Sequence, residues 1–316
     1  MNLLYKGIDI MKWDKMGKIY TANGQQAWAY SHAMIPTPEL LGNGVIRMYI
    51  TFCNKQGIGR IGFVDIDAKN PEKVLAISSE PLLDKGQPGC FDENGVVATS
   101  IVTLADGKKL LYYVGFELGT KIRYRLLTGL AVSDDGGQSF SRVQRTPVLE
   151  RSNTELYFRC GPFVLYENQI FRMWYVAGDQ WITINGKEMP VYTINYLESK
   201  DGVTWGPKGK VCIDIAHKGE HGFGRPYLIK HDGKYKMFYS IRVPNLGYRL
   251  GYAESQDGID WQRKDDEIGL DVSPTGWDSE MVCYSAVIAV NNKYMMFYNG
   301  NNFGQTGFGW AEFQEW

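Results

Sequence analysis

The sequence predicts an all-β protein, a five-bladed β-propeller in which each blade is a four-stranded antiparallel sheet. The main observation is an internal repeat, because an apolar strand pattern that closes in tyrosine recurs along the whole chain. The closing residues are Tyr49, Tyr113, Tyr175, Tyr239 and Tyr298, at steps of 64, 62, 64 and 59 residues. The second observation is that each repeat reads as strands and turns, which is typical of a propeller with one sheet per blade.

One repeat shows the unit most fully. Residues 233–240 form an apolar strand pattern, residues 248–255 form a second one, and an Asp-Gly turn closed by Trp261 follows. A similar turn recurs at residues 133–140 and 198–205. Aspartate accepts backbone hydrogen bonds in such turns and glycine adopts the positive φ that they require, so we expect these turns to be structural.

The remaining elements follow in chain order. Residues 8–13 echo the end of a repeat at residues 258–261, whereas the last repeat stops at a third strand near residue 313. We therefore expect residues 1–27 to complete the last blade and close the ring, which removes an exposed sheet edge. The blades then cover about 28–90, 91–150, 151–216, 217–273 and 274–316, in a single domain of residues 1–316. An insertion at residues 179–190 is long enough to overhang a pocket.

Composition narrows the range of functions. The net charge of -1 gives no electrostatic basis for binding nucleic acid or an anionic membrane. No apolar run reaches the length of a membrane span and the N-terminal residues do not resemble a signal peptide, so we expect no membrane insertion and a cytoplasmic protein. The five cysteines are widely scattered, which favours reduced thiols over a disulfide or metal framework. An aromatic content of 14% suits packed sheets and also sugar binding.

Candidate catalytic residues lie in the segments that precede the first strand of each blade. In a propeller these segments converge on one mouth, and acidic side chains recur in them at a similar offset, with His32 at that place in the first blade. The candidates for acid, base or nucleophile are Asp92, Glu93, Glu155, Glu220 and Glu280. The alternative for each acid is that it anchors its own loop.

A second group of residues in the same segments is expected to bind substrate. Arginine near the axis could hold a carboxylate, a phosphate or sugar hydroxyls, with an ion pair to a neighbouring acid as the alternative. The candidates are His32, Arg159, His221, Arg225, Trp277, Asp278 and Tyr284. No metal-ligand spacing is present, so neither a metal nor another cofactor is expected.

Glu280 is the preferred general acid. Asp278 stands beside it, so each carboxylate would raise the cost of ionising the other, and Trp277 and Tyr284 would supply apolar walls. Asp92 or Glu93, across the mouth, would then stay ionised as base or nucleophile.

The stretch at residues 224–240 and the Gly-Tyr-Ala-Glu-Ser-x-Asp-Gly-x-x-Trp motif at residues 251–261 resemble the five-bladed propeller glycosidases, glycoside hydrolase families 43, 32, 68, 117 and 130. Residues 277–284 and 298–304 resemble a bacterial branch of glycosylases that accompany surface-polysaccharide enzymes. The resemblance spans nearly the whole chain and implies an axial site with catalytic carboxylates. This sequence lacks the Asn-Asp-Pro, Arg-Asp-Pro and Glu-Cys-Pro motifs of these families, with Arg159-Cys160-Gly161-Pro162 where the last would stand.

The leading functional hypothesis is a glycoside hydrolase, or a related glycosyl-transferring enzyme, acting on a bacterial saccharide or polysaccharide. A non-catalytic propeller that binds carbohydrate is the first alternative, favoured by His32 in place of a first-blade acid. A sialidase-like enzyme acting on a carboxylated sugar is the second, although sialidases have six blades and a third arginine. The sequence does not define the oligomeric state or the sugar.

Overall fold

The computed structural model describes residues 10–216 and 219–315, and the protein is all-β as predicted. No helix in these ranges is long and apolar enough to cross a bilayer. The strands are β1 (Lys12–Tyr20), β2 (Ser31–Leu40), β3 (Val45–Cys53), β4 (Gly59–Asp67), β5 (Val74–Ile77), β6 (Val96–Thr103), β7 (Lys109–Leu118), β8 (Tyr124–Ser133), β9 (Ser141–Arg142), β10 (Phe158–Glu167), β11 (Ile170–Ile184), β12 (Lys187–Ser199), β13 (Lys210–Ile213), β14 (Gly222–His231), β15 (Lys234–Arg242), β16 (Arg249–Ser255), β17 (Gln262–Arg263), β18 (Cys283–Val290), β19 (Lys293–Asn299) and β20 (Phe308–Glu315). A 3-10 turn η1 (Asp265–Glu267) and a short helix α1 (Asn301–Gly304) complete the described elements.

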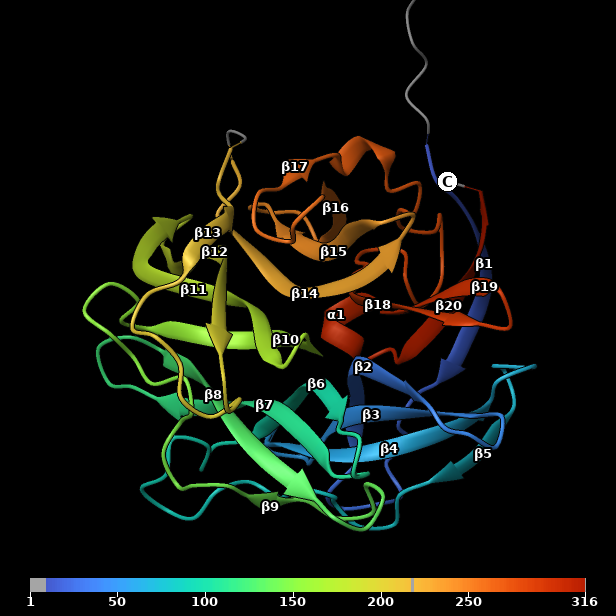
Figure 1. The fold of residues 1–316 in the computed structure, drawn as a ribbon, viewed down its shortest axis with the longest axis horizontal. Coiled ribbons are helices and arrows are strands. Elements are labelled where there is room, and N and C mark those ends of the chain that lie inside the picture. Colours follow the sequence, from blue (N-terminus) through green and yellow to red (C-terminus); the bar gives the residue numbers. More distant parts are fainter. Residues whose placement is uncertain (1–9, 217–218, 316) are drawn as a thin grey trace, which may run out of the picture.

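The strands form antiparallel groups of four around a common centre, and β2, β6, β10, β14 and β18 are the innermost strands (Figure 1). Strands β2 to β5 and β14 to β17 form separate sheets. The groups β6–β9 and β10–β13 are joined, because β10 pairs in parallel with β8 through Phe158 and Arg159. The structure thus differs from the prediction of one separate sheet per repeat, since the inner strand β10 of one group pairs with the third strand β8 of the preceding group.

The apolar core lies between neighbouring groups. One cluster packs Tyr49 and Ile61 of the first group against Val96 and Leu111 of the second. Strands alternate their side chains between two faces, and the first group is covered on both, by the last group on one side and by the second group on the other. This packing explains why the repeat strands are apolar at most positions instead of showing a clean alternation.

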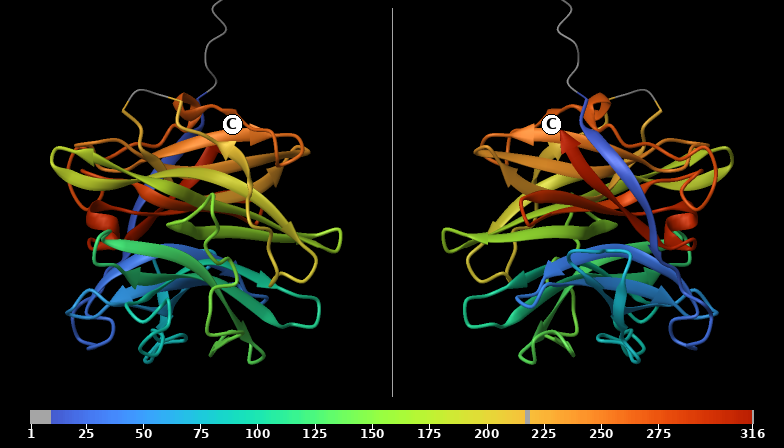
Figure 2. Two further views of the ribbon diagram at one scale, coloured as in Figure 1. Left: turned by 90° about the vertical axis from the view of Figure 1, so that its left-hand side faces the viewer. Right: turned by 90° about the vertical axis from the view of Figure 1, so that its right-hand side faces the viewer.

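Strand β1 occupies the outer edge of the last group. It pairs antiparallel with β20 from Lys12 opposite Glu315 to Tyr20 opposite Phe308, so the two ends of the described chain lie side by side (Figure 2). The ring of Trp13 packs edge-on against Phe313, with ring centroids 4.9 Å apart. Residues 8 and 9 of the sequence echo lie outside the described residues.

Removing the Trp13 side chain should weaken this edge. Trp13 is 9% exposed and belongs to the cluster that joins β1 to the preceding group. We expect Trp13→Ala to lower the free energy of unfolding by about 3 kcal/mol, because a buried aromatic ring is lost and a cavity is left. Urea denaturation followed by circular dichroism measures this. An unchanged midpoint would show that β1 contributes little to the stability of the protein.

The inner strands are irregular near the axis, and Arg225 of β14 fills the space between them. Each inner strand has a register shift, for example between Gly224 and Tyr227 in β14. From this position Arg225 donates to the carbonyl oxygens of Pro36 (3.1 Å), Thr99 (3.2 Å), Tyr284 (3.2 Å) and Ser285 (3.3 Å), and to the hydroxyl of Thr37 (3.0 Å). One guanidinium therefore connects β14 with β2, β6 and the start of β18.

The Asp-Gly turns are structural, as expected. In the turn after β12, the carboxylate of Asp201 accepts hydrogen bonds from the backbone N–H groups of Val203 and Thr204, and Gly202 has a φ of +71°. These bonds hold the pKa of Asp201 well below its usual range. The Asp-Gly turns contribute no residue to the described lining of the two cavities discussed below.

Candidate functional site

Two cavities flank the hairpin of β11 and β12, and His221 lines both. The arginine cavity, of about 320 Å³, is lined among others by Arg242, Tyr248 and Phe303. The glutamate cavity, of about 480 Å³, is lined among others by Glu155 and Glu220. Both volumes fall in the range of small-molecule sites, so the region around His221 is the candidate functional site.

The predicted insertion at residues 179–190 forms the tip of this hairpin and a wall of both cavities. Asn185 and Gly186 form a two-residue turn with φ values of +51° and +75°, the left-handed conformation that Asn-Gly turns favour. The side chain of Asn185 donates to that of Asn245 in the β15–β16 loop at 2.8 Å. The hairpin thus reaches the next group of strands and separates the arginine cavity from the glutamate cavity.

Aromatic rings surround the guanidinium of Arg242, at the end of β15. It lies over the rings of Tyr192 (4.6 Å) and Tyr248 (5.7 Å). Tyr284 lies edge-on to Tyr248 at 5.9 Å, and its φ of +54° places a bulky residue in the left-handed region, a strained conformation that clusters at functional sites. Phe303, which is 41% exposed, packs edge-on against Tyr248 and offers an accessible apolar surface.

His221 lies beside this cluster without a hydrogen-bond partner. It is 4% exposed, and neither ring nitrogen contacts a donor or acceptor among the described residues. Burial, together with the nearby charge of Arg242, lowers the pKa of His221 to about 4. The imidazole is therefore neutral at physiological pH, with one N–H to donate and one nitrogen to accept.

This pKa predicts a pH-dependent stability. The unfolded chain protonates His221 near its ordinary pKa of 6.5, while the folded protein does so only near 4. Between these values the unfolded state binds more protons, so stability is complete above pH 6.5 and falls as the pH approaches 4. We expect this residue to account for up to about 3 kcal/mol of that loss.

Urea denaturation of wild type and His221→Asn at several pH values measures the effect. The variant should lose less stability than wild type between pH 6.5 and 4. Parallel curves for wild type and His221→Asn would contradict the lowered pKa.

Glu155 and Glu220 are the two predicted catalytic residues that the structure brings to one cavity. The carboxylate of Glu155 accepts from Arg159 (2.6 Å), Tyr175 (2.7 Å), Asn195 (2.9 Å) and the backbone N–H of Gly209 (3.0 Å). That of Glu220 accepts two bonds from Arg263, at 2.6 and 3.0 Å. Both acids are thus fixed in position by their partners at the wall of the glutamate cavity.

Asp92, Glu155 and Asp278 belong to a recurring structural unit. Each repeat tyrosine donates its hydroxyl to a carboxylate, in the pairs Tyr49–Glu39 (2.9 Å), Tyr113–Asp92 (3.0 Å), Tyr175–Glu155 (2.7 Å), Tyr239–Asp265 (2.6 Å) and Tyr298–Asp278 (3.1 Å). Each carboxylate also pairs with a cation, respectively Lys109, Arg142, Arg159, Arg263 and Lys15. Burial and the adjacent carboxylate raise the pKa of all five tyrosines. Asp92 and Asp278 lie outside the described lining of both cavities, so the structural alternative accounts for their positions.

The prediction of an apolar environment for Glu280 is wrong. Its side chain is exposed, and Trp277, one of the two expected apolar walls, stacks on Tyr298 with 5.2 Å between the ring centroids. Glu280 also lies outside the described lining of both cavities. Glu93 is partly exposed and accepts from the backbone N–H of Gly89 at 2.8 Å, which is a loop-anchoring contact.

The arginines expected to bind substrate are engaged within the protein. Arg159 donates to Glu155 and to the carbonyl oxygens of Glu150 (2.6 Å) and Gly206 (2.7 Å). Arg225 spans the axis as described above and is 2% exposed. A bidentate contact from either side chain to a substrate would require these internal bonds to break, so the structure does not present them as binding groups.

Of the other residues expected to bind substrate, some lie at the candidate site and some lie away from it. His32 has a φ of +62° and its Nδ1 lies 3.0 Å from the hydroxyl of Ser31, outside the lining of both cavities. One ring face of Trp277 is covered by Tyr298. Tyr284 belongs to the aromatic group near Arg242, and His221 lies at the centre of the site.

Sequence reasoning missed Arg242, Tyr192 and Tyr248. Arg242 lies two residues after the apolar strand pattern of residues 233–240, and a charged residue continuing such a strand was a signal that could have been used. The tyrosines gave no signal of their own, because tyrosine is abundant in every repeat. In the described residues, no three His, Cys, Asp or Glu side chains gather in a metal-binding arrangement.

Comparison with known proteins assigns this chain to a protein family. No protein-family model matches it. The protein Rv1502 of Mycobacterium tuberculosis (strain ATCC 25618 / H37Rv), described as uncharacterized, is 34% identical over 301 residues, which cover 95% of this chain and 99% of Rv1502. The chain belongs to the Rv1502 family.

Solved structures similar to this member of the Rv1502 family include several glycoside hydrolases. A thermostable family-43 glycoside hydrolase covers 93% of this chain and is itself covered to 91%, with a TM-score of 0.67 and 18% identity. A glycosyl hydrolase from Bacteroides ovatus covers 96% and is covered to 94%, with a TM-score of 0.72 and 12% identity. At this identity the likeness shows the fold, which agrees with the resemblance found in the sequence.

Proposed function

We propose that this protein is a glycoside hydrolase, or a related glycosyl-transferring enzyme, whose saccharide substrate binds around His221. The observation that supports this most directly is that Glu155 and Glu220 line one cavity together with His221. Most glycoside hydrolases use two carboxyl groups that flank the bond to be cleaved. The fold shared with family-43 glycoside hydrolases favours the same class of chemistry.

The proposed reaction divides two roles between Glu155 and Glu220. One carboxyl group gives its proton to the oxygen of the leaving sugar as the bond from that oxygen to the anomeric carbon breaks. The other carboxylate takes a proton from the attacking water or attacks the anomeric carbon itself. His221 lines both cavities and would contact the sugar at the cleaved bond. The rings of Tyr248 and Phe303 in the arginine cavity would hold a neighbouring sugar of the same saccharide, since flat aromatic rings pack well against the apolar face of a pyranose.

A non-catalytic carbohydrate-binding protein is the second candidate. It is favoured by the dense bonding of Glu155, whose partners are a buried arginine, a tyrosine, an asparagine and a backbone amide. A carboxylate so firmly held serves well as a structural anchor, and the cavities would then bind a glycan without cleaving it.

Incubation with a panel of bacterial glycans, followed by detection of new reducing ends, separates the two candidates. The hydrolase proposal expects release from at least one glycan. A glycan that binds, as measured by calorimetry, but is never cleaved would overturn the hydrolase and support the binding protein.

We also propose that the groups of strands are the blades of one five-bladed propeller domain covering residues 1–316, closed by β1. The support is the order β1-β20-β19-β18 in the last sheet, together with the arrangement of the inner strands around one centre (Figure 1).

A further inference from the structure

We propose that Arg242 and His221 form a subsite for the carboxylate of an acidic sugar, so that the saccharide bound by this protein contains a uronic acid. This inference rests on the proposed carbohydrate site and specifies its ligand. It is carried by a comparison of the buried arginines, by the unpartnered nitrogens of His221, and by the arginine cavity that both residues line.

Arg242 differs from the other buried arginines of the described chain in lacking compensation for its charge. Arg47 forms a two-bond ion pair with Asp65, and Arg159 pairs with Glu155. Arg225 has no carboxylate partner but donates to five oxygens. Arg242 is 5% exposed, its single protein hydrogen bond is one of 3.4 Å from Nη1 to the carbonyl oxygen of Pro190, and its Nε has no partner.

A buried, uncompensated guanidinium is costly, and a bound anion would remove this cost. Among the described residues no carboxylate lies within ion-pair distance of Arg242, so the counter-charge would come from the ligand. The planar fork of arginine matches a carboxylate with two parallel hydrogen bonds. A sugar carboxylate carries one negative charge that can pair with Arg242, and Lys187, which also lines this cavity, adds to the positive charge there.

The surroundings suit a sugar that carries this group. Tyr192 and Tyr248 hold the guanidinium by stacking, which fixes the direction of its free donors. The neutral imidazole of His221 can donate one further hydrogen bond to the carboxylate or to a neighbouring hydroxyl. The exposed ring of Phe303 adds an apolar surface for the pyranose in the same cavity.

The test compares two ligands that differ at the carboxylate. Methyl β-D-glucuronide and methyl β-D-glucoside are titrated into the wild-type protein, with the galacturonide and galactoside as a second pair, and binding is measured by ligand-observed NMR. We expect at least one uronide to bind about 10-fold or more tightly than its neutral partner. Equal affinities within both pairs, or no uronide binding at tens of millimolar, would overturn the inference.

Variants identify the residue responsible. Arg242→Gln should abolish the preference for the uronide, and Arg242→Lys should retain part of it because charge remains but the fork is lost. Arg123→Gln is the control: Arg123 lies over Tyr124 and Trp181 near the same hairpin, so it tests for a general effect of positive charge. A preference that persists in Arg242→Gln would contradict the assignment.

Binding is read directly, so the result is independent of catalysis. Uronide binding without cleavage of any glycan would retain the subsite and reject the hydrolase. Cleavage of neutral glycans by a protein with no preference for the uronide would retain the hydrolase and reject the subsite. If Arg242→Gln fails to fold, the ligand pairs on the wild-type protein still decide the question.

Discussion

Replacing Arg225 with methionine is expected to lower the free energy of unfolding by about 4 kcal/mol. The substitution keeps an apolar stem but removes the donors that bind the carbonyl oxygens of Pro36, Thr99, Tyr284 and Ser285. These buried acceptors would lose their partner, and each unsatisfied group costs about 1–3 kcal/mol. The burial that produces this arrangement also lowers the pKa of Arg225 to about 10.

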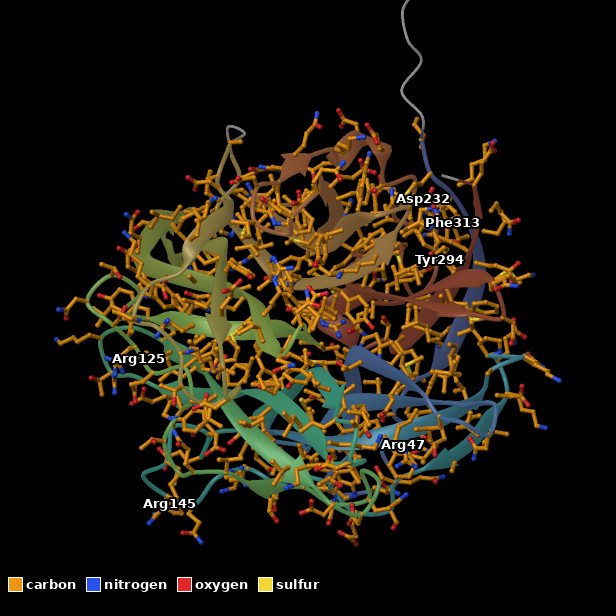
Figure 3. The ribbon with its side chains drawn as sticks, in the orientation of Figure 1. Arg47, Arg125, Arg145, Asp232, Tyr294 and Phe313 are labelled. Carbon is orange, nitrogen blue, oxygen red and sulfur yellow. The ribbon has the colours of Figure 1, made fainter. Side chains whose placement is uncertain are left out.

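Chemical denaturation of the wild type, Arg225→Met and Arg145→Met measures the loss. Arg145 is exposed at the outer rim of the molecule (Figure 3), and its replacement should change stability by less than about 0.5 kcal/mol. If both variants unfold at the same denaturant concentration, the axial contacts of Arg225 are not important for stability.

Glu220→Gln is expected to reduce turnover by roughly 10²- to 10⁴-fold if the protein is a glycoside hydrolase. Glutamine is nearly the same size as glutamate but cannot transfer a proton or act as a carboxylate nucleophile. Glu220 is a cleaner test than Glu155, because Arg263 remains paired with Asp265 at 2.6 Å when Glu220 is neutralised. The variant should therefore fold, and a thermal melt checks this.

Glu280→Gln is the matched control. Glu280 occupies the corresponding place in the sequence of the last repeat, but its side chain is exposed and lies away from the described cavity lining. Turnover of Glu280→Gln should stay within about twofold of wild type, since general acid–base effects require contact with the reacting atoms. The reverse outcome, with Glu280→Gln inactive and Glu220→Gln active, would move the catalytic site to the last group of strands.

The repeat made the fold accessible to sequence reasoning. The five tyrosines lie at equivalent places in successive groups because each packs between neighbouring sheets, which imposes the same apolar strand pattern every time. The Asp-Gly turns and the hairpin at residues 179–190 were also visible, since their glycines and asparagines mark turns. The pairing of β8 with β10 was not visible, because it involves only two residues of each strand and leaves no pattern in the sequence.

The site was harder to predict for a physical reason. Acids that recur before the inner strands can face a cavity or bind a tyrosine under the loop, and both uses require the same residue type at the same spacing. Asp92 and Asp278 each accept a hydrogen bond from a repeat tyrosine. Glu155 does both, because it accepts from Tyr175 and also lines a cavity. Arg242 was identified because it has no ion-pair partner among the described residues. The sequence cannot reveal this, because it depends on which side chains surround the guanidinium in three dimensions.

The pairing of β1 with β20 determines how the molecule would respond to tension. Lys12 lies opposite Glu315, so the first residues of β1 and the last residues of β20 lie at the same end of this strand pair. A force that pulls the ends apart would load one cross-strand hydrogen bond at a time, because these bonds lie perpendicular to antiparallel strands. The exposed ion pair between Lys12 and Glu315, at 2.6 Å, would break first, and β1 would then peel away residue by residue toward Tyr20. The protein would therefore open at this edge by unzipping. Breaking the β1–β20 hydrogen bonds one after another needs a lower force than breaking all of them at once by shear.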